Sequence, residues 1–178
     1  MKEKISAFVI TKNEEDKIEK CLHHLLWTDE MVVIDSYSTD KTEAIVKKFT
    51  KKIYKKEFSG YGLQKQAAID KCTHDWILEV DADEIVTEEL QKEIIALLDS
   101  PQISKYGAYK IQRQEYFLGK KLMTSKIPRL YKKDCVKYYG EIHEKVKIKG
   151  NIGDLKNKIE HESDKYETIA RRVEKINE

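Results

Sequence analysis

Residues 76–84, WILEVDADE, begin as an apolar run and end in a cluster of acidic residues. A short run such as 76–80, bounded by polar residues, is typical of a strand buried inside a parallel sheet. We expect this strand to end at Asp81, so that the acidic cluster follows it directly. Ligands of open α/β sheets bind beyond the carboxyl ends of the strands. The segment therefore predicts a central strand with a binding site at its end.

Asp81 and Asp83 are separated by a single residue. In an extended segment, residues i and i+2 project to the same side, and two rises of about 3.3 Å place their backbones roughly 6–7 Å apart. This spacing suits one divalent ion, or one ion together with a ribose hydroxyl. Carboxylate oxygens are ligands that Mg²⁺ or Mn²⁺ prefers when bound jointly with substrate phosphates. The pair therefore predicts a metal or substrate site.

Strands and helices alternate around this segment. Apolar patterns predict strands over 5–10, 31–35 and 52–55. They predict helices over 14–26, 62–72 and 87–98, and a further short helix that carries Ile45, Val46 and Phe49. Asn13 is the expected cap of the first helix, and Thr39 or Asp40 that of the second. Such alternation implies crossover units and a mainly parallel sheet. After Pro101 the pattern changes to strands over 107–113, 127–132 and 144–149, followed by an amphipathic helix over 163–178.

Length and composition indicate one globular domain. The chain has 178 residues, within the range of about 100–200 residues for a single domain, and 40% of them are apolar. The cysteines Cys21, Cys72 and Cys135 are far apart and form no CxxC pair. They argue against a disulfide framework or a cysteine zinc site and suit a reducing cytosol. The sequence also lacks the motifs of Rossmann dehydrogenases, P-loop enzymes and esterases.

Charge is distributed unevenly along the chain. Residues 1–102 carry 15 Lys and Arg against 21 Asp and Glu, a net −6, whereas residues 103–160 carry 15 against 6, a net +9. The basic segment is expected to face phosphate, an anionic substrate or an anionic membrane surface. It forms no recognisable nucleic-acid module, so nucleic acid is not an expected partner.

Targeting signals are absent from the sequence as given. No apolar run approaches the roughly 18 residues of a membrane span, and acidic residues interrupt the N-terminus before a signal-peptide core forms. We expect a cytoplasmic protein, with peripheral contact at the cytoplasmic face of the inner membrane as a further hypothesis. The apolar stripe of 163–178 still runs at the last residue, so we expect the natural chain to continue.

Three motifs, taken in order, resemble glycosyltransferase family 2. They are ITKNE at 10–14, VIDSYSTDKT at 33–42 and DADE at 81–84. Four more segments are similar to the branch that adds glucose to the lipopolysaccharide inner core, namely GYGLQK at 60–65, YFLG at 116–119, PRLY at 128–131 and HEKV at 143–146.

The resemblance implies a GT-A fold. This is an α/β/α sandwich whose nucleotide-binding half, over 1–102, has a mainly parallel sheet, and whose mixed acceptor half covers 103–162. The helix of 163–178 would complete a single domain over 1–178. The implied reaction is an inverting transfer of a hexose, glucose, from a nucleotide diphosphate sugar such as UDP-glucose. The implied acceptor is a glycan or lipopolysaccharide core, and the implied cofactor is Mg²⁺ or Mn²⁺.

The same resemblance assigns roles to individual residues. It implies a nucleotide pocket formed by Thr11, Asn13, Glu14, Asp35, Lys65 and Asp81. Asp35 would approach the base, and Asp81 would meet the ribose or the metal. Asp83 would bind the metal that bridges the donor diphosphate, where a cation stabilises the charge of the departing group.

The carboxylate that takes the proton from the acceptor hydroxyl is less clearly marked. The Glu-Asp pair used by many family members downstream of the metal motif is missing, which leaves Glu144 and then Glu141 as candidate bases around His143. His143 would orient the base or touch phosphate, or it is structural. Glu144 is otherwise a solvated carboxylate beside lysines.

Two further residues have two interpretations each. Arg129 could clamp the diphosphate or an anionic acceptor with its guanidinium, or form a strand salt bridge. His161 matches a histidine of the resembled branch and could complete the metal shell, or it is an exposed residue at a strand end. Two rival functions stay open, a non-catalytic nucleotide-sugar-binding module and a phosphohydrolase of the haloacid-dehalogenase type, which also uses an Asp-x-Asp pair.

Overall fold

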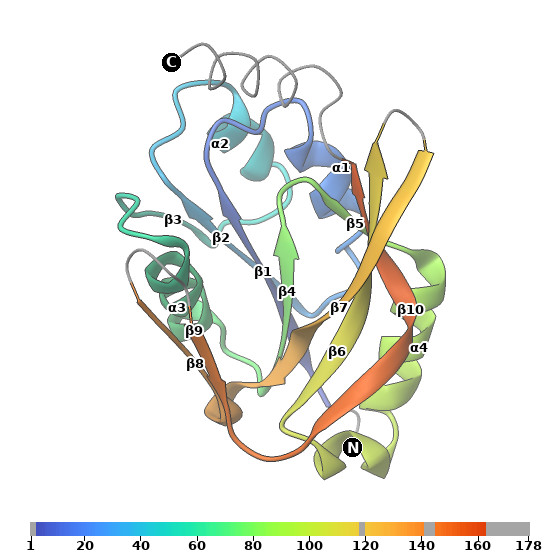
Figure 1. Ribbon diagram of the computed structural model, residues 1–178. Helices are drawn as coiled ribbons and strands as arrows, with labels where there is room; N and C mark the ends of the chain where they lie inside the picture. The colour runs from blue at the N-terminus through green and yellow to red at the C-terminus, as the bar shows by residue number, and fades with distance from the viewer. Residues whose placement is uncertain (1–2, 118–119, 141–144, 163–178) are drawn as a thin grey trace.

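The structure, a computed structural model, describes residues 3–117, 120–140 and 145–162 (Figure 1). The strands are β1 (Ile5–Thr11), β2 (Glu30–Asp35), β3 (Ile53–Lys55), β4 (Trp76–Asp81), β5 (Glu84–Val86), β6 (Ala108–Phe117), β7 (Lys120–Lys132), β8 (Val136–Tyr139), β9 (Lys145–Ile148) and β10 (Ile152–Glu162). The α-helices are α1 (Ile18–His23), α2 (Thr42–Val46), α3 (Tyr61–Lys71) and α4 (Glu88–Leu98). Two short 3-10 helices cover Pro101–Lys105 and Lys133–Cys135.

Eight strands form one sheet in the order β3-β2-β1-β4-β7-β6-β10-β5. The first four run parallel, whereas β7 pairs antiparallel with both β4 and β6. Strand β10 then pairs parallel with β6 and antiparallel with β5. The sheet thus changes from parallel to mixed at β4, as the sequence predicted for its two halves.

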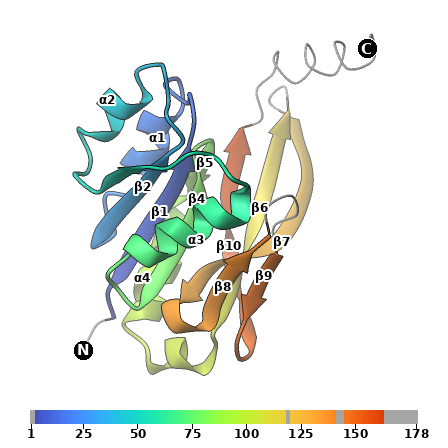
Figure 2. The same cartoon turned by 90° about the vertical axis from the view of Figure 1, so that its left-hand side faces the viewer.

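Both faces of the sheet are covered, because the central strands are apolar on both sides. Along β1, Ile5, Ala7 and Val9 belong to one buried cluster together with residues of α1 and α4. Phe8 points to the opposite side, into a second cluster with residues of α3 and β8. Figures 1 and 2 show α3 and the small β8–β9 sheet on one side of the large sheet and α4 on the other. The expected α/β/α sandwich is confirmed, with β8–β9 as an additional part of one outer layer.

The first helix differs from the prediction. Helix α1 covers only Ile18–His23 and begins after Lys17 without a side-chain cap, so the expected cap by Asn13 is wrong. Asn13 has a φ of 54°, and its Oδ1 accepts hydrogen bonds from Thr39 in the loop after β2. The side chain of Asn13 therefore links the loop after β1 to the loop after β2 instead of capping a helix.

Strand β10 was missed because its pattern is broken. Leu155 and Ile159 are its buried apolar side chains, they stand among many charged residues, and the register with β6 shifts between Asp154 and Lys158. A β-bulge of this kind interrupts the strict alternation by which strands are recognised in a sequence. The predicted helix over 163–178 lies outside the described residues.

A buried carboxylate fastens the end of the sheet opposite to the acidic cluster. The side chain of Glu30, 3% exposed, accepts hydrogen bonds from Ser6 and Lys52 and from the amide and hydroxyl of Thr73 at 2.8 and 2.9 Å. Burial opposes ionisation, but these hydrogen bonds outweigh it and lower the pKa of Glu30 from 4.5 to about 2. The carboxylate thereby joins β1, β2 and the turn before β4.

This depressed pKa predicts a contribution to stability that depends on pH. Because the folded pKa lies below the unfolded one, the stabilisation is full above pH 4.5 and is lost as the pH falls toward 2. We expect Glu30→Gln to lower the free energy of unfolding at pH 7 by about 2 kcal/mol and to flatten its decline in acid. Urea titrations between pH 3 and pH 7 measure both effects. Glu88→Gln, at an exposed helix position, is the matched control. Equal pH profiles for the two variants would contradict this role.

Candidate functional site

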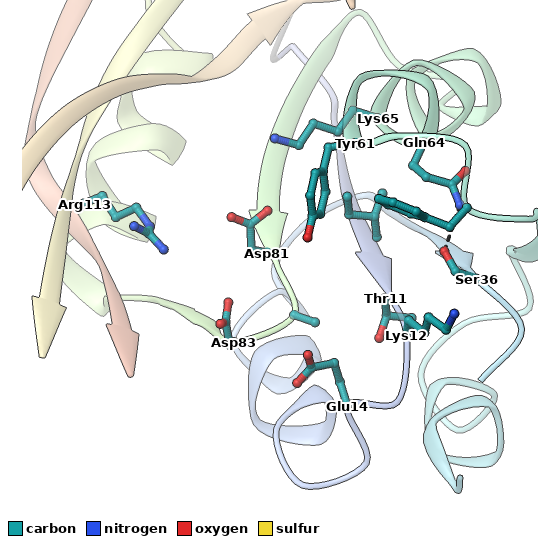
Figure 3. A pocket seen from close by; sticks show the side chains of 13 residues that line it. Thr11, Lys12, Glu14, Ser36, Tyr61, Gln64, Lys65, Asp81, Asp83 and Arg113 are labelled. Carbon is teal, nitrogen blue, oxygen red and sulfur yellow. Dashed lines mark hydrogen bonds between the residues drawn. The ribbon is translucent and has the colours of Figure 1, made fainter. Parts of the chain in front are cut away.

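A pocket opens at the carboxyl ends of the parallel strands, with a cavity volume of about 530 Å³. Its lining comes from the ends of β1 and β4, the loop after β2, the start of α3 and strand β6. The residues are Ile10, Thr11, Lys12, Glu14, Ser36, Phe58, Tyr61, Gln64, Lys65, Asp81, Ala82, Asp83 and Arg113 (Figure 3). The structure therefore brings together Thr11, Glu14, Lys65, Asp81 and Asp83 from the set predicted for the donor site.

The two aspartates reach the pocket by a different route from the one expected. Strand β4 ends at Asp81, and Ala82 and Asp83 form a turn rather than an extended segment. The carboxylate of Glu84 accepts a hydrogen bond from the amide of Asp81 at 2.9 Å and so closes this turn. Figure 3 shows Asp81 and Asp83 as neighbours, with Arg113 on one side of them and Thr11 and Tyr61 on the other.

Asp35, predicted to approach the base, is completely buried and is not among the lining residues that the structure describes. Its carboxylate accepts hydrogen bonds from the hydroxyl of Ser38 at 2.5 Å and from the amide of Ser38 at 3.2 Å. Asn13, also outside the lining, holds the next residue of this loop. Both side chains therefore shape the loop that presents Ser36 to the pocket.

Arg129 lies beneath the pocket floor, with only 5% of its side chain exposed. It donates to Asp81 Oδ2 at 2.6 Å, to Glu84 Oε1 at 3.0 Å and to Glu79 Oε1 at 2.5 Å. Burial opposes its charge, but the three carboxylates raise its pKa, so the guanidinium stays protonated. Of its two predicted roles, the structure shows the salt bridge, which joins β7 to carboxylates of β4 and β5.

The same guanidinium determines the ionisation of Asp81. Burial opposes the charge on Asp81, but attraction and hydrogen bonding from Arg129 outweigh burial and lower the pKa of Asp81 to about 2. Burial and the neighbouring Asp81 raise the pKa of Glu84, with Arg129 acting against them. Asp81 therefore offers a charged carboxylate to the pocket that it lines.

His161, from β10, lies beside Asp83. Its Nε2 is 2.8 Å from Asp83 Oδ2, and its Nδ1 is 2.6 Å from Glu115 Oε2. The sequence predicted a place for His161 near the metal motif but gave no sign of Glu115. A carboxylate on the far nitrogen of a histidine is the arrangement that fixes ring orientation at many metal sites.

The residues around the pocket suit a divalent cation, although no group of three or more His, Cys, Asp or Glu in the described part of the chain forms a ready-made metal cage. Five carboxylates lie in one contact network, those of Glu79, Asp81, Asp83, Glu84 and Glu115. The permanent cations in it are Lys65, Arg113 and Arg129. Among the described residues, these five acidic side chains outnumber the three permanent cations. A cation held by Asp83 beside Asp81, with further ligands from a phosphate, would restore the balance.

Lys65 contacts the network at Glu79, away from the pair formed by Asp83 and His161. Its ammonium lies 3.0 Å from Glu79 Oε1 and is mostly buried. Burial opposes its charge, but Glu79 and Asp81 raise its pKa, so it stays protonated. Position and charge agree with the predicted contact to the nucleotide.

Several pocket residues were not predicted. Arg113, Lys12 and Gln64 line the cavity, and Phe58 and Tyr61 form an edge-to-face pair 5.0 Å apart at its mouth, half or more exposed. Gln64 and Tyr61 lie within the GYGLQK segment, from which the family resemblance gives a role to Lys65 alone. Arg113 lies outside the YFLG segment at the end of the same strand, so no motif of the sequence includes it.

The candidate bases Glu144 and Glu141, with His143, lie outside the described residues. Their segment follows Gly140, which packs against α3. A Cβ on Gly62 of α3 would lie 3.0 Å from the carbonyl oxygen of Tyr139 and 3.1 Å from that of Gly140. A Cβ at position 62 would require this backbone to move aside by a few tenths of an ångström. The described chain before the segment therefore adjoins the helix whose first turns line the pocket.

The Arg129 network predicts a large effect of removing the guanidinium. We expect Arg129→Met to lower the free energy of unfolding by about 3–5 kcal/mol, because it leaves buried carboxylates without a counter-charge. Lys126→Met, on the same strand, is the control, because this lysine is half exposed and forms only a 3.5 Å pair with Asp154. Urea denaturation measures both. A cost below about 1 kcal/mol for Arg129→Met would show that the network is not structural.

Within the part of the chain that the structure describes, no helix has the length and apolar character required to cross a bilayer.

Comparisons with known proteins agree with the architecture. An uncharacterised glycosyltransferase of Rickettsia conorii is 44% identical over 111 residues, which are 62% of this chain and 39% of that protein. The lipopolysaccharide core biosynthesis glycosyltransferase LpsC of Rhizobium meliloti is 28% identical over 164 residues, 85% of this chain and 60% of that protein. The chain therefore spans about two fifths to three fifths of the length of these relatives.

The crystal structure of residues 1–349 of S. aureus TarS in complex with UDP-GlcNAc superposes with a TM-score of 0.70 at 19% identity, covering 94% of this chain and 60% of that TarS fragment. This likeness confirms the expected GT-A fold. A family model described as glycosyl transferase family 2 matches residues 6–155. Because that match takes in most of the sequence, this chain belongs to glycosyl transferase family 2.

Proposed function

We propose that the chain is the catalytic domain of an inverting glycosyltransferase that moves glucose from UDP-glucose to a lipopolysaccharide core or a related glycan. The observation that carries this proposal is the pair Asp81 and Asp83, which share a pocket with Lys65 at the ends of the parallel strands. Family membership supports the reaction class. We also infer that residues 1–178 form a single domain.

The donor and the acceptor rest on different support. TarS, which shares the fold, was crystallised with UDP-GlcNAc and with UDP, which favours a uridine diphosphate sugar. LpsC takes part in lipopolysaccharide core biosynthesis, which favours a core acceptor. Glucose itself follows only from the resemblance of the sequence to the inner-core branch.

The arrangement of charges fits an inverting displacement. As the acceptor hydroxyl attacks the anomeric carbon, the bond to the nucleotide diphosphate breaks and negative charge grows on the departing phosphate. A divalent cation would act there as a Lewis acid. Asp83 would hold it, with Asp81 kept ionised by Arg129 and His161 beside Asp83. Lys65, charged at the other side of the network, would contact the nucleotide.

Two rival functions would use the same pocket. A phosphohydrolase of the haloacid-dehalogenase type is disfavoured by the family match and by the position of the Asp-x-Asp pair after β4 rather than after the first strand. A non-catalytic module would bind the donor in the same way and would differ only in turnover.

Donor binding that requires manganese is the first expected result. We expect UDP-glucose to raise the melting temperature of the protein only when Mn²⁺ is present, because the cation offsets the carboxylates facing the diphosphate. Asp83→Asn should abolish this shift, whereas Asp154→Asn, at an exposed position, should retain it. Slow release of glucose from the bound donor would then favour the enzyme over the module. An unchanged shift in Asp83→Asn would remove Asp83 from the metal site.

The general base requires a separate comparison. We propose Glu144, then Glu141, as the group that takes the acceptor proton. Glu144→Gln should leave the affinity for UDP-glucose and Mn²⁺ unchanged and lower the transfer rate by about 10²-fold or more. Glu141→Gln, at the second candidate base three positions earlier in the sequence, serves as the paired variant, and acceptor turnover is the measurement. Normal transfer by Glu144→Gln would exclude this residue as the base.

A cytoplasmic location is part of this proposal, as is peripheral contact of the basic half with an anionic membrane surface. The widely spaced cysteines support the cytoplasmic location, and the net +9 of residues 103–160 supports the membrane contact. Failure of the protein to cosediment with vesicles containing anionic lipid would count against the membrane contact.

A further inference from the structure

Arg113 stands on the side of the pocket formed by the second half of the chain. It belongs to β6, which joins the sheet beyond β4 and β7. Figure 3 shows its guanidinium directed toward Asp81 and Asp83, with Ser36 and Gln64 on the far side of those two aspartates. The residue therefore faces the pocket from the direction opposite to the loops predicted to hold the nucleotide.

Two carboxylates fix the orientation of this guanidinium. Its Nε donates to Glu84 Oε1 at 2.6 Å, and its Nη1 donates to Glu115. Glu84 is completely buried and also bonds Arg129, while Glu115 is held by His161. Since the guanidinium is planar, these contacts on two of its nitrogens define its plane.

The remaining donors of Arg113 are available to a ligand. Arginine carries five N–H groups, and within residues 3–117, 120–140 and 145–162 its Nη2 has no hydrogen-bond partner. The side chain lines the pocket and is 23% exposed. A charged, oriented donor edge thus faces the cavity. Such an edge pairs best with a carboxylate or phosphate, to which it donates charge-assisted hydrogen bonds.

We propose that Arg113 binds an anionic group, a carboxylate or a phosphate, on the acceptor glycan. This inference rests on the proposed transferase function. Lys65 and a cation at Asp83 would serve the donor diphosphate, and the acceptor must approach the donor sugar from the side of the pocket away from the nucleotide. Of the described residues that line the pocket, Arg113 is the one contributed by the second half of the chain, and it comes from the segment whose net charge is +9. An acceptor with a negative charge near its reacting hydroxyl would therefore be selected over a neutral one.

A pair of matched probes tests this selectivity. Methyl β-D-glucuronide and methyl β-D-glucoside differ in one carboxylate, and their dissociation constants would be measured by ligand-observed NMR, with and without UDP and Mn²⁺. We expect the wild-type protein to bind the glucuronide about tenfold more tightly, as one charge-assisted interaction implies. Arg113→Gln should lose this preference, while Lys126→Gln, an exposed lysine on the neighbouring strand, should keep it.

The dissociation constant of UDP separates the two possible sources of the bound anion. If Arg113→Gln keeps the preference for the glucuronide, or if the wild-type protein shows none, the proposal is overturned. It is also overturned if Arg113→Gln weakens UDP binding tenfold without changing the preference, which would place Arg113 on the donor phosphate. Arg113→Lys keeps a charge beside Glu84 and loses the planar fork, so it should fold and retain only part of the preference. A wild-type protein that binds the glucuronide but not UDP would reject the donor proposal alone.

Discussion

The buried guanidinium of Arg129 holds three carboxylates, Glu79, Asp81 and Glu84, at one point beneath the pocket. Ionised groups so far from water are unstable unless each finds a counter-charge and hydrogen bonds. Arg129 supplies both, and it keeps Asp81 ionised at the carboxyl end of β4. The negative face of the pocket therefore depends on a positive charge that does not line it.

The same contacts explain the uneven charge of the sequence. Glu79, Asp81, Asp83 and Glu84 come from the acidic first half, whereas Arg113 and Arg129 come from the basic second half. The halves meet where β7 pairs with β4, which places cationic side chains of one against carboxylates of the other. Arg129 thus neutralises buried carboxylates inside the molecule, whereas Arg113 faces the pocket.

The site is arranged as two connected groups. Asp81 is bonded to Arg129, Asp83 to His161, and Arg113 joins them by contacting Glu84 in the first group and Glu115 in the second. A substitution of one aspartate would therefore alter the hydrogen bonds of the other through these side chains. This coupling arises because β4, β7, β6 and β10 are neighbours in one sheet, so their polar side chains lie close together.

The sequence by itself determined the parallel half of the sheet, because apolar runs with polar residues at their ends are local signals. Its short motifs also pointed to Asp81, Asp83 and Lys65, which line the pocket. It could not show that Asp83 sits in a turn, that Asp35 and Asn13 support a loop instead of lining the pocket, or that Arg129 is an internal counter-charge. Arg113 and Glu115 carry no motif at all. Their importance comes from the pairing of β6 with β7 and β10, and pairing between strands distant in the chain is decided by the packing of the whole sheet.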